Sequence, residues 1–326
     1  MKATAVARSN IALAKYWGKR AVPGNVPATP SLSITLAGLE TRTTVSFDAA
    51  LERDAFTLGG ALVDGESLAR VTRVLDEVRA LAGFAHRARV ESANDFPTAS
   101  GLASSASGFA ALVRAALAAA KVEPAPGGGA LAAASRMARR ASASAARSMF
   151  GGFVALGTGE GEGDDPAAVV VAPKEHWEIA VVVGAVTLAP KNVGSTSGMQ
   201  HCRDTSPYFP AWVEDAPKLF AEVRRAVLAR DLAALGAAAE ASALRMHACM
   251  MASDPALLYF QPATMALLAE VRALRAQGVG AWATIDAGPH VKVITALADA
   301  PRVEAALQPR CARTLVAVPG DGAEVA

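Results

Sequence analysis

The chain has 326 residues, of which 52% are hydrophobic and 19% are charged. Its 32 basic and 30 acidic residues give a formal net charge of +2. This length supports two domains or one large domain. The balanced charge argues against a general nucleic-acid-binding protein, which needs a concentrated basic surface, but it is compatible with a local basic pocket for an anionic small molecule.

Cysteine usage and hydropathy favour the cytoplasm. The three cysteines are far apart and odd in number, so neither a disulfide framework nor a zinc site is expected. Residues 1–19 contain no apolar run long enough for a signal peptide. The most apolar stretch, 108–120, is interrupted by Arg114 and is too short to span a bilayer. We therefore expect a cytoplasmic protein without a membrane or nucleic-acid partner.

The first half of the chain predicts short strands and then helices. Strand-like segments occur at residues 31–36, 41–47 and 86–91, the first two with alternating, β-branched patterns. Apolar residues at helical spacing on one face indicate an amphipathic helix at residues 66–81. A Gly/Ser-rich loop then leads into an alanine-rich helix that ends near residue 121, and another helix is expected at 130–140.

The second half combines longer helices with strands at hairpin-like spacing. A polar turn at 157–166 precedes a domain boundary near Pro173, which gives domains 1–173 and 174–326. Helices are expected at 216–228, 231–250 and 262–276, with Asp231 as an N-cap and Gly278 as a C-terminal stop. Strands are expected at 179–186, 281–285, 291–295 and 313–318. This mixture favours an α+β fold over a doubly wound sheet.

The segment 97–108, PTASGLASSASG, has the features of a phosphate-binding loop. Gly101 allows backbone angles that other residues avoid, and the small side chains leave backbone N–H groups uncovered. The loop leads into a helix N-terminus, where free N–H groups and the helix dipole favour an anion. Hydroxyls of Ser104, Ser105 and Ser107 are suited to phosphate or magnesium. A serine-rich turn that only caps a helix is equally compatible with the composition.

Charged residues in apolar surroundings mark three more segments. Lys15 and Lys19 flank two aromatic residues, where cations are costly unless they are solvated or paired with an anion; two surface lysines are the alternative. Arg147 follows small residues, and its guanidinium suits a carboxylate or phosphate; a structural salt bridge is the alternative. Asp286 ends an apolar strand beside a glycine turn, where an ordinary turn-forming aspartate is the alternative.

The order of residues in these segments resembles a known superfamily. Segment 97–108 is similar to the PxxxGLxSSA phosphate-binding motif of the GHMP kinases. Residues 10–19, NIALAKYWGK, resemble the NIALIKYWGK signature of diphosphomevalonate decarboxylases. The segments RRASASAARSMFGGF at 139–153, STSGMQ at 195–200 and TIDAGP at 284–289 resemble further segments of that family, in the same order along the chain.

The resemblance implies a fold and a reaction. It implies the GHMP kinase fold, with an N-terminal domain like ribosomal protein S5, a C-terminal ferredoxin-like α/β sandwich, and a deep cleft between them. The implied reaction converts mevalonate 5-diphosphate and ATP to isopentenyl diphosphate, ADP, phosphate and carbon dioxide, with Mg²⁺ as cofactor. A homodimer is also expected by analogy with relatives.

The resemblance also implies roles for individual residues. Lys15, Arg147 and Asp286 would be catalytic, with Asp286 near the substrate's tertiary hydroxyl and Arg147 on its carboxylate. Substrate contacts are implied for Tyr16, Lys19, Arg73, Ser142, Ser144, Arg147, Ser195 and Thr196. ATP contacts are implied for Pro97, Ser100, Gly101, Leu102, Ala103, Ser104, Ser105 and Ser107, and a Mg²⁺ contact for Ser105.

Several positions depart from the family pattern. Ala141 and Ala143 replace glycines, and Thr196 stands where bacterial relatives often carry an arginine that contacts the diphosphate. Two alternatives therefore stay open: a decarboxylase that acts on mevalonate 5-phosphate, and a mevalonate-type kinase that does not decarboxylate. The KYWGK and RSMFGGF segments argue against a homoserine or sugar kinase, and Asp286 argues against a non-enzymatic binding module.

Overall fold

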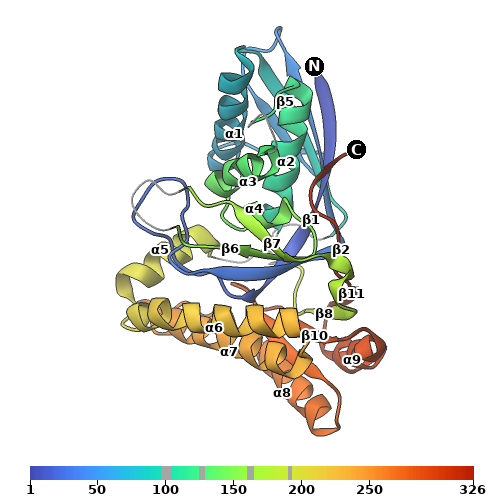
Figure 1. Ribbon diagram of the computed structural model, residues 1–326. Helices are drawn as coiled ribbons and strands as arrows, with labels where there is room; N and C mark the ends of the chain where they lie inside the picture. Colours follow the sequence, from blue (N-terminus) through green and yellow to red (C-terminus); the bar gives the residue numbers. More distant parts are fainter. Residues whose placement is uncertain (97–103, 125–128, 160–164, 190–192) are drawn as a thin grey trace.

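The computed structural model of the protein describes residues 1–96, 104–124, 129–159, 165–189 and 193–326. In these residues the chain forms two sheets, each covered by helices, with one unit above the other in Figure 1. This mixed architecture confirms the predicted α+β class.

The first sheet is built mainly from the N-terminal half. In the described part of the chain its strands are β1 (Lys2–Ala14), β2 (Ser31–Asp48), β3 (Ala55–Leu58), β4 (Ala61–Leu62), β5 (Arg87–Asn94), β6 (Phe153–Leu156), β7 (Ala168–Ala172) and β12 (Glu324–Val325). They run in the order β12-β1-β2-β5-β3-β4, with β6 paired to β2 and β7 to β6. The two strands predicted at 31–36 and 41–47 form one long strand, whose pairing with β1 shifts register between Thr35 and Glu40, where Gly38 has a positive φ of 78°.

Helices pack against the first sheet on the side opposite the second unit (Figure 1). They are α1 (Glu66–Ala82), α2 (Ser104–Ala120), α3 (Ala130–Ala141) and the short α4 (Ala145–Ser148). Helix α2 is buried along most of its length, because its alanine side chains allow close approach to β1 and β2. This packing directs the N-terminal end of α2 toward the large cavity described below.

The second sheet is antiparallel, with the order β11-β8-β10-β9. Its strands are β8 (Ile179–Ala185), β9 (Ala281–Ile285), β10 (Val291–Ala296) and β11 (Arg313–Ala317), and the helices of this unit are α5 (Ser195–Thr205), α6 (Phe209–Ala229), α7 (Leu232–Met251), α8 (Pro262–Ala276) and α9 (Ala300–Leu307). The Asp231 side chain accepts a hydrogen bond from the Ala234 N–H at 3.0 Å, which confirms the predicted N-cap of α7. Gly278 follows the end of α8 with a φ of 83°, as predicted.

The two units share a core. One apolar cluster joins the lower ends of β1 and β2, such as Ile11 and Leu32, to residues of the second unit such as Val181 and Val223. The predicted boundary at residue 173 lies between β7 and β8. The final strand nevertheless returns to the first sheet, because Val325 of β12 pairs with Ala5 of β1. In the described residues, no helix is both long and apolar enough to cross a bilayer.

Candidate active site

A cavity of about 840 Å³ lies between the two units. Its walls come from the end of β1, the first turns of α1 and α2, the α3–α4 connection, α5 and the turn after β9. The described lining includes seven cationic side chains, namely Lys15, Lys19, Arg70, Arg73, Arg140, Arg147 and Arg203. It includes only two carboxylates, those of Glu66 and Asp286. The cavity is therefore suited to ligands that carry several negative charges.

Most predicted site residues in the described part of the chain line this one cavity. They are Lys15, Tyr16, Lys19, Arg73, Ser104, Ser105, Ser142, Ser144, Arg147, Ser195, Thr196 and Asp286. Pro97, Ser100, Gly101, Leu102 and Ala103 lie outside the described residues. Residues as distant in sequence as Lys15 and Asp286 thus share one wall, although no local pattern relates them.

Ser107, which is among the expected ATP contacts, does not line this cavity. Its side chain is completely buried in α2, and its hydroxyl lies 2.6 Å from Thr41 Oγ1 and 3.2 Å from Ser9 Oγ. The Ser107 hydroxyl lies where α2 packs against the sheet, and the cavity lining does not include it. Its hydroxyl therefore joins α2 to β1 and β2.

Asp286 follows β9 in a tight turn whose geometry is fixed by the backbone. The Gly288 N–H donates to the Asp286 carbonyl at 2.7 Å, and His247 Nε2 donates to the same carbonyl at 3.1 Å. Burial alone would raise the pKa of the Asp286 carboxyl, but the charges of Lys15 and Lys292 outweigh it and hold the pKa well below its usual range. The carboxylate is therefore ionised at neutral pH, and its side chain is one-quarter exposed.

Lys15 connects the end of β1 to this carboxylate. Its ammonium group donates to Asp286 Oδ1 at 2.6 Å and to the Ala12 carbonyl at 2.9 Å, while its backbone N–H donates to Ser242 Oγ at 2.9 Å. Burial lowers the pKa of Lys15 to about 8, against the opposing effect of Asp286. The first unit thus supplies a buried cation and the second unit a partly exposed anion to one ion pair.

Arg147 lines the cavity, and its guanidinium is held by neutral oxygens. Its guanidinium donates to Ser31 Oγ at 2.7 Å, to Ser33 Oγ at 3.0 Å and more weakly to Asn10 Oδ1 at 3.3–3.4 Å. Burial lowers its pKa to about 10, so it still carries its charge at neutral pH. None of its contacts within the described chain is an ion pair with a carboxylate, so the group is placed to receive an anion from the cavity.

Tyr16 and Lys19 lie on the segment that follows β1. The Tyr16 hydroxyl is buried without a hydrogen-bond partner among the described residues, and burial raises its pKa, so it is a neutral donor at the cavity wall. Lys19 Nζ donates to Asn25 Oδ1 at 2.7 Å. Gly18 lies between them with a φ of 101°, and an added Cβ would lie 2.7 Å from the Phe209 ring, so this turn requires glycine.

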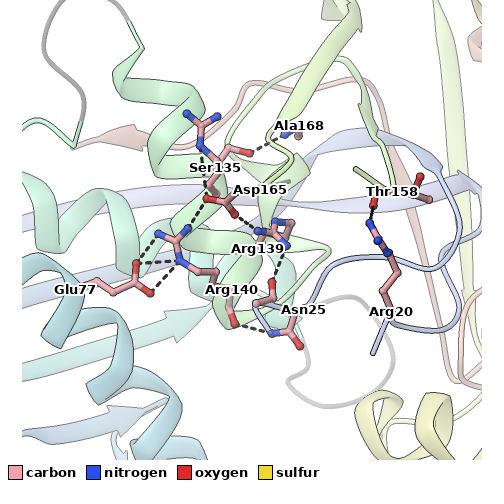
Figure 2. A network of polar contacts seen from close by, with 11 residues as sticks. Arg20, Asn25, Glu77, Ser135, Arg139, Arg140, Thr158, Asp165 and Ala168 are labelled. Atoms are coloured by element: carbon pink, nitrogen blue, oxygen red, sulfur yellow. Dashed lines mark hydrogen bonds and ion pairs between the residues drawn. The ribbon is translucent and has the colours of Figure 1, made fainter. Parts of the chain in front are cut away.

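A polar network fixes the segment that carries Lys19 (Figure 2). Asn25 Nδ2 donates to the Arg140 carbonyl at 2.6 Å, and Arg139 Nη1 donates to the Gly24 carbonyl at 2.7 Å. Figure 2 shows both arginines directed toward Asp165, with which each forms an ion pair.

The same network extends to α1. Arg140 pairs with Glu77 at 2.7 Å, so α1 and α3 are joined across their facing sides. Arg139 and Arg140 therefore do more than compensate the dipole of α3, which is the ordinary expectation for basic residues at a helix end. Arg139 holds the Gly24 carbonyl, and the Arg140 carbonyl holds Asn25, which in turn accepts from Lys19.

The hydroxyls of Ser104 and Ser105 are the described donors suited to a nucleotide and its metal. Both residues line the cavity at the N-terminal end of the 17-residue helix α2, where an anion is favoured. No group of three or more metal-ligating His, Cys, Asp or Glu side chains occurs in the described residues. This donor set fits Mg²⁺ that is held chiefly by phosphate oxygens and water, with few protein ligands.

Comparison with known proteins decides the family. Residues 7–168 match the model of the diphosphomevalonate decarboxylase-like N-terminal domain, and residues 181–315 match that of the mevalonate 5-diphosphate decarboxylase C-terminal domain. The chain is 36% identical to the diphosphomevalonate decarboxylase of Ganoderma lucidum over 90% of its own length and 78% of that protein. The chain belongs to the diphosphomevalonate decarboxylase family.

Solved structures of the family agree over the whole chain. A structure of MDDEF in complex with MVAPP, AMPPCP and magnesium has a TM-score of 0.91 and 35% identity, and covers 100% of this chain and 99% of that one. The mevalonate diphosphate decarboxylase of Staphylococcus aureus has a TM-score of 0.90 and 32% identity, with coverage of 100% and 98%. These likenesses confirm the GHMP kinase fold predicted from the sequence motifs.

Sequence reasoning missed several residues of the candidate active site. Lys292 and His247 both contact Asp286, and Arg203 lines the cavity on the same helix as Thr196. A lysine within the otherwise apolar segment VKVI was a signal for Lys292, because a charged residue inside a buried strand requires a partner. For His247 the sequence offers no comparable signal, since its partner is a backbone carbonyl.

Proposed function

We propose that this protein catalyses the ATP-dependent decarboxylation of mevalonate 5-diphosphate to isopentenyl diphosphate, with release of ADP, phosphate and carbon dioxide. One observation carries the proposal: Asp286, Lys15 and Arg147 lie together on the wall of a strongly cationic cavity that both units form. A substrate with a carboxylate, a tertiary hydroxyl and a diphosphate matches these groups.

The charge of the cavity supports two polyanionic ligands at once. Lys19 and Arg73 lie away from Asp286 in sequence but line the same cavity, and we assign them with Tyr16 to the substrate's phosphates. Ser104 and Ser105 at the start of α2 are assigned to the nucleotide. Bound ATP with Mg²⁺ would supply the phosphoryl group and neutralise part of its charge.

Asp286 acts as an ionised hydrogen-bond acceptor that orients the tertiary hydroxyl and receives its proton as the oxygen–phosphorus bond forms. Because its pKa is held low by two lysines, it is a weak base. Phosphoryl transfer through a loose transition state demands positioning and charge neutralisation more than a strong base. The cationic groups Lys15 and Arg147 at the same site stabilise negative charge that develops on oxygen.

Arg147 holds the substrate carboxylate until the carbon–carbon bond breaks. Loss of phosphate from the tertiary carbon leaves positive character there, and the electrons of the bond to the carboxylate then form the double bond as carbon dioxide departs. The neutral partners of Arg147 leave its full charge for this carboxylate. Ser142 and Ser144, at the α3–α4 connection, complete the substrate contacts that we assign.

The compartment, assembly and domain division are part of the same proposal. Three unpaired cysteines support a reducing compartment, for which we propose the cytoplasm. A homodimer is proposed from the family resemblance. We also propose that residues 1–173 and 174–326 are the two domains. The last strand, β12, belongs to the second range in sequence but pairs with β1 of the first sheet.

Product analysis tests the proposal. Purified protein with ATP and Mg²⁺ is offered mevalonate 5-diphosphate or mevalonate 5-phosphate, each labelled at the carboxylate, and released carbon dioxide and ADP are measured. We expect both products in equal amounts with the diphosphate. Release with the monophosphate alone would favour a phosphomevalonate decarboxylase, and ADP without carbon dioxide would favour a kinase.

A further inference from the structure

The Asp286 carboxylate accepts hydrogen bonds from two buried lysines, although the charge of one lysine would be enough to neutralise it. Lys15 donates to Oδ1 at 2.6 Å, and Lys292 donates to Oδ2 at 2.9 Å. Both lysine side chains are 1% exposed. Lys15 lines the cavity, whereas Lys292 does not, so Lys292 approaches the carboxylate from the protein side. Burying a second ammonium group is costly and calls for a functional reason.

Lys292 is held rigidly by the sheet. It lies in β10, between β8 and β9, where it is opposite Val183 on one side and Thr284 on the other. Thr284 Oγ1 donates weakly, at 3.4 Å, to the Ala12 carbonyl, which also accepts from Lys15 at 2.9 Å. The two lysines and the carboxylate therefore belong to one fixed arrangement that spans both units.

The other titratable groups around Asp286 add no negative charge. Arg147 contributes a nearby cation. Burial, followed by the charge of Lys15, lowers the pKa of His247 to about 3, so that ring is neutral at physiological pH. The Tyr16 hydroxyl is neutral as well, because burial raises its pKa. Without Lys292, the pair of Asp286 and Lys15 would be electrically neutral.

We propose that Lys292 is a positioning residue for Asp286. It holds Oδ2 on the side away from the cavity, and it gives the group formed by the carboxylate and the two lysines a net positive charge. This proposal rests on the proposed function. The fixed Oδ2 leaves Oδ1 and its remaining lone pair toward the substrate hydroxyl. The surplus positive charge attracts the phosphoryl oxygens to a site that would otherwise present a carboxylate to them.

Three variants test this assignment. Lys292→Met removes the charge and keeps a linear side chain of similar length, while Lys292→Arg retains the charge. Lys218→Met makes the same chemical change at an exposed position of α6 and serves as the matched control. Each variant is assayed for kcat, KM and the pH profile of kcat/KM, its melting temperature is measured, and its Asp286 carboxyl is titrated by carbon-13 NMR.

We expect a specific combination of effects in Lys292→Met. Its kcat should fall about 10- to 100-fold, the effect of losing one hydrogen bond to a charged group, with KM changed less. The pKa of Asp286 should rise, because one of the two charges that lower it is gone. The alkaline limit set by Lys15, whose pKa is about 8, should also move upward, since Lys292 repels the Lys15 charge. Lys292→Arg should recover a large part of kcat.

Two results would overturn the proposal. One is native kcat and an unshifted pH profile in Lys292→Met. The other is a loss of kcat with an unchanged Asp286 titration and no recovery in Lys292→Arg, which would indicate a structural role only. Failure of the native protein to release carbon dioxide would refute the proposed reaction separately, and the NMR titration would still decide whether Lys292 controls the charge of Asp286.

Discussion

Asp286→Asn removes one charge and almost no volume at the centre of the site. In the native protein the carboxylate lies 2.6 Å from Lys15 Nζ and 2.9 Å from Lys292 Nζ, and both ammonium groups are buried. Loss of one partner from a buried charge pair costs about 3–5 kcal/mol of unfolding free energy. For a chain of this size we expect a decrease in melting temperature of roughly 5–15 °C.

The size of this destabilisation should depend on pH in a defined direction. Burial lowers the pKa of Lys15 from 10.5 to about 8, and Asp286 opposes that effect. In the variant the pKa of Lys15 falls further, so the folded variant loses this proton at a lower pH than the folded native protein. The difference in melting temperature should therefore be largest well below pH 8 and shrink as pH rises through about 8.

Turnover provides the second measurement on Asp286→Asn. Release of carbon dioxide should fall by about 10²- to 10⁴-fold, the usual contribution of a group that handles the reacting proton. Binding of a fluorescent ATP analogue should stay near native, because Asp286 follows β9 of the second unit, whereas the serines that we assign to the nucleotide begin α2 of the first unit. Turnover within about tenfold of native, or a destabilisation that grows with pH, would refute this reasoning.

The remaining predictions concern four other positions. Arg147→Met should lower kcat/KM by at least about tenfold, because a charged hydrogen bond to the substrate carboxylate is lost. ATP binding, measured by fluorescence, should not change. Equal losses of kcat/KM and of ATP affinity would contradict the role of Arg147 on the carboxylate. Native kcat/KM should decrease as pH rises through about 8, because Lys15 loses its proton there; a flat profile from about pH 7 to 10 would count against a charged Lys15. Asn25→Ala should raise KM for the diphosphate substrate more than it lowers kcat, because Asn25 holds Lys19; a pure kcat effect would exclude that role. Arg79 forms a buried ion pair with Asp54 at 2.9 Å, and neither residue lines the cavity. Arg79→Met should therefore lower the free energy of unfolding, measured by chemical denaturation, by about 3–5 kcal/mol. A changed kcat in the folded variant would contradict this assignment.

The sequence was most informative where a local pattern carried the chemistry. Hydrophobic periodicity and capping residues located α1 and the start of α7, and the motif segments placed Lys15, Arg147 and Asp286 on one cavity wall. Local pattern was less informative for β2. Alternation indicated two strands there, at 31–36 and 41–47, but both segments pair with β1 on one side, and with β6 and β5 respectively on the other, as parts of one strand.

Tertiary contacts account for the residues that sequence reasoning misplaced or missed. Ser107 belongs to a motif of hydroxyls, yet the rotation of α2 directs it to Thr41. The role of Lys292 depends on antiparallel pairing across β9 and β10, which brings it within 2.9 Å of Asp286. Arg139 and Arg140 depend on Asp165, which comes from a segment with no recognisable motif.

The return of β12 to the first sheet has a consequence for how the protein is made. The N-terminal sheet lacks its outer partner for β1 until Glu324 and Val325 have been synthesised, about 150 residues after β7 has left the ribosome. At typical elongation rates this interval lasts roughly 10–30 s. During that time Ala5 and Val6 of β1 lack the strand that pairs with them, and unpaired strand edges favour association with other chains. Synthesis speed and chaperone supply should therefore influence the yield of this protein more than its final stability would suggest.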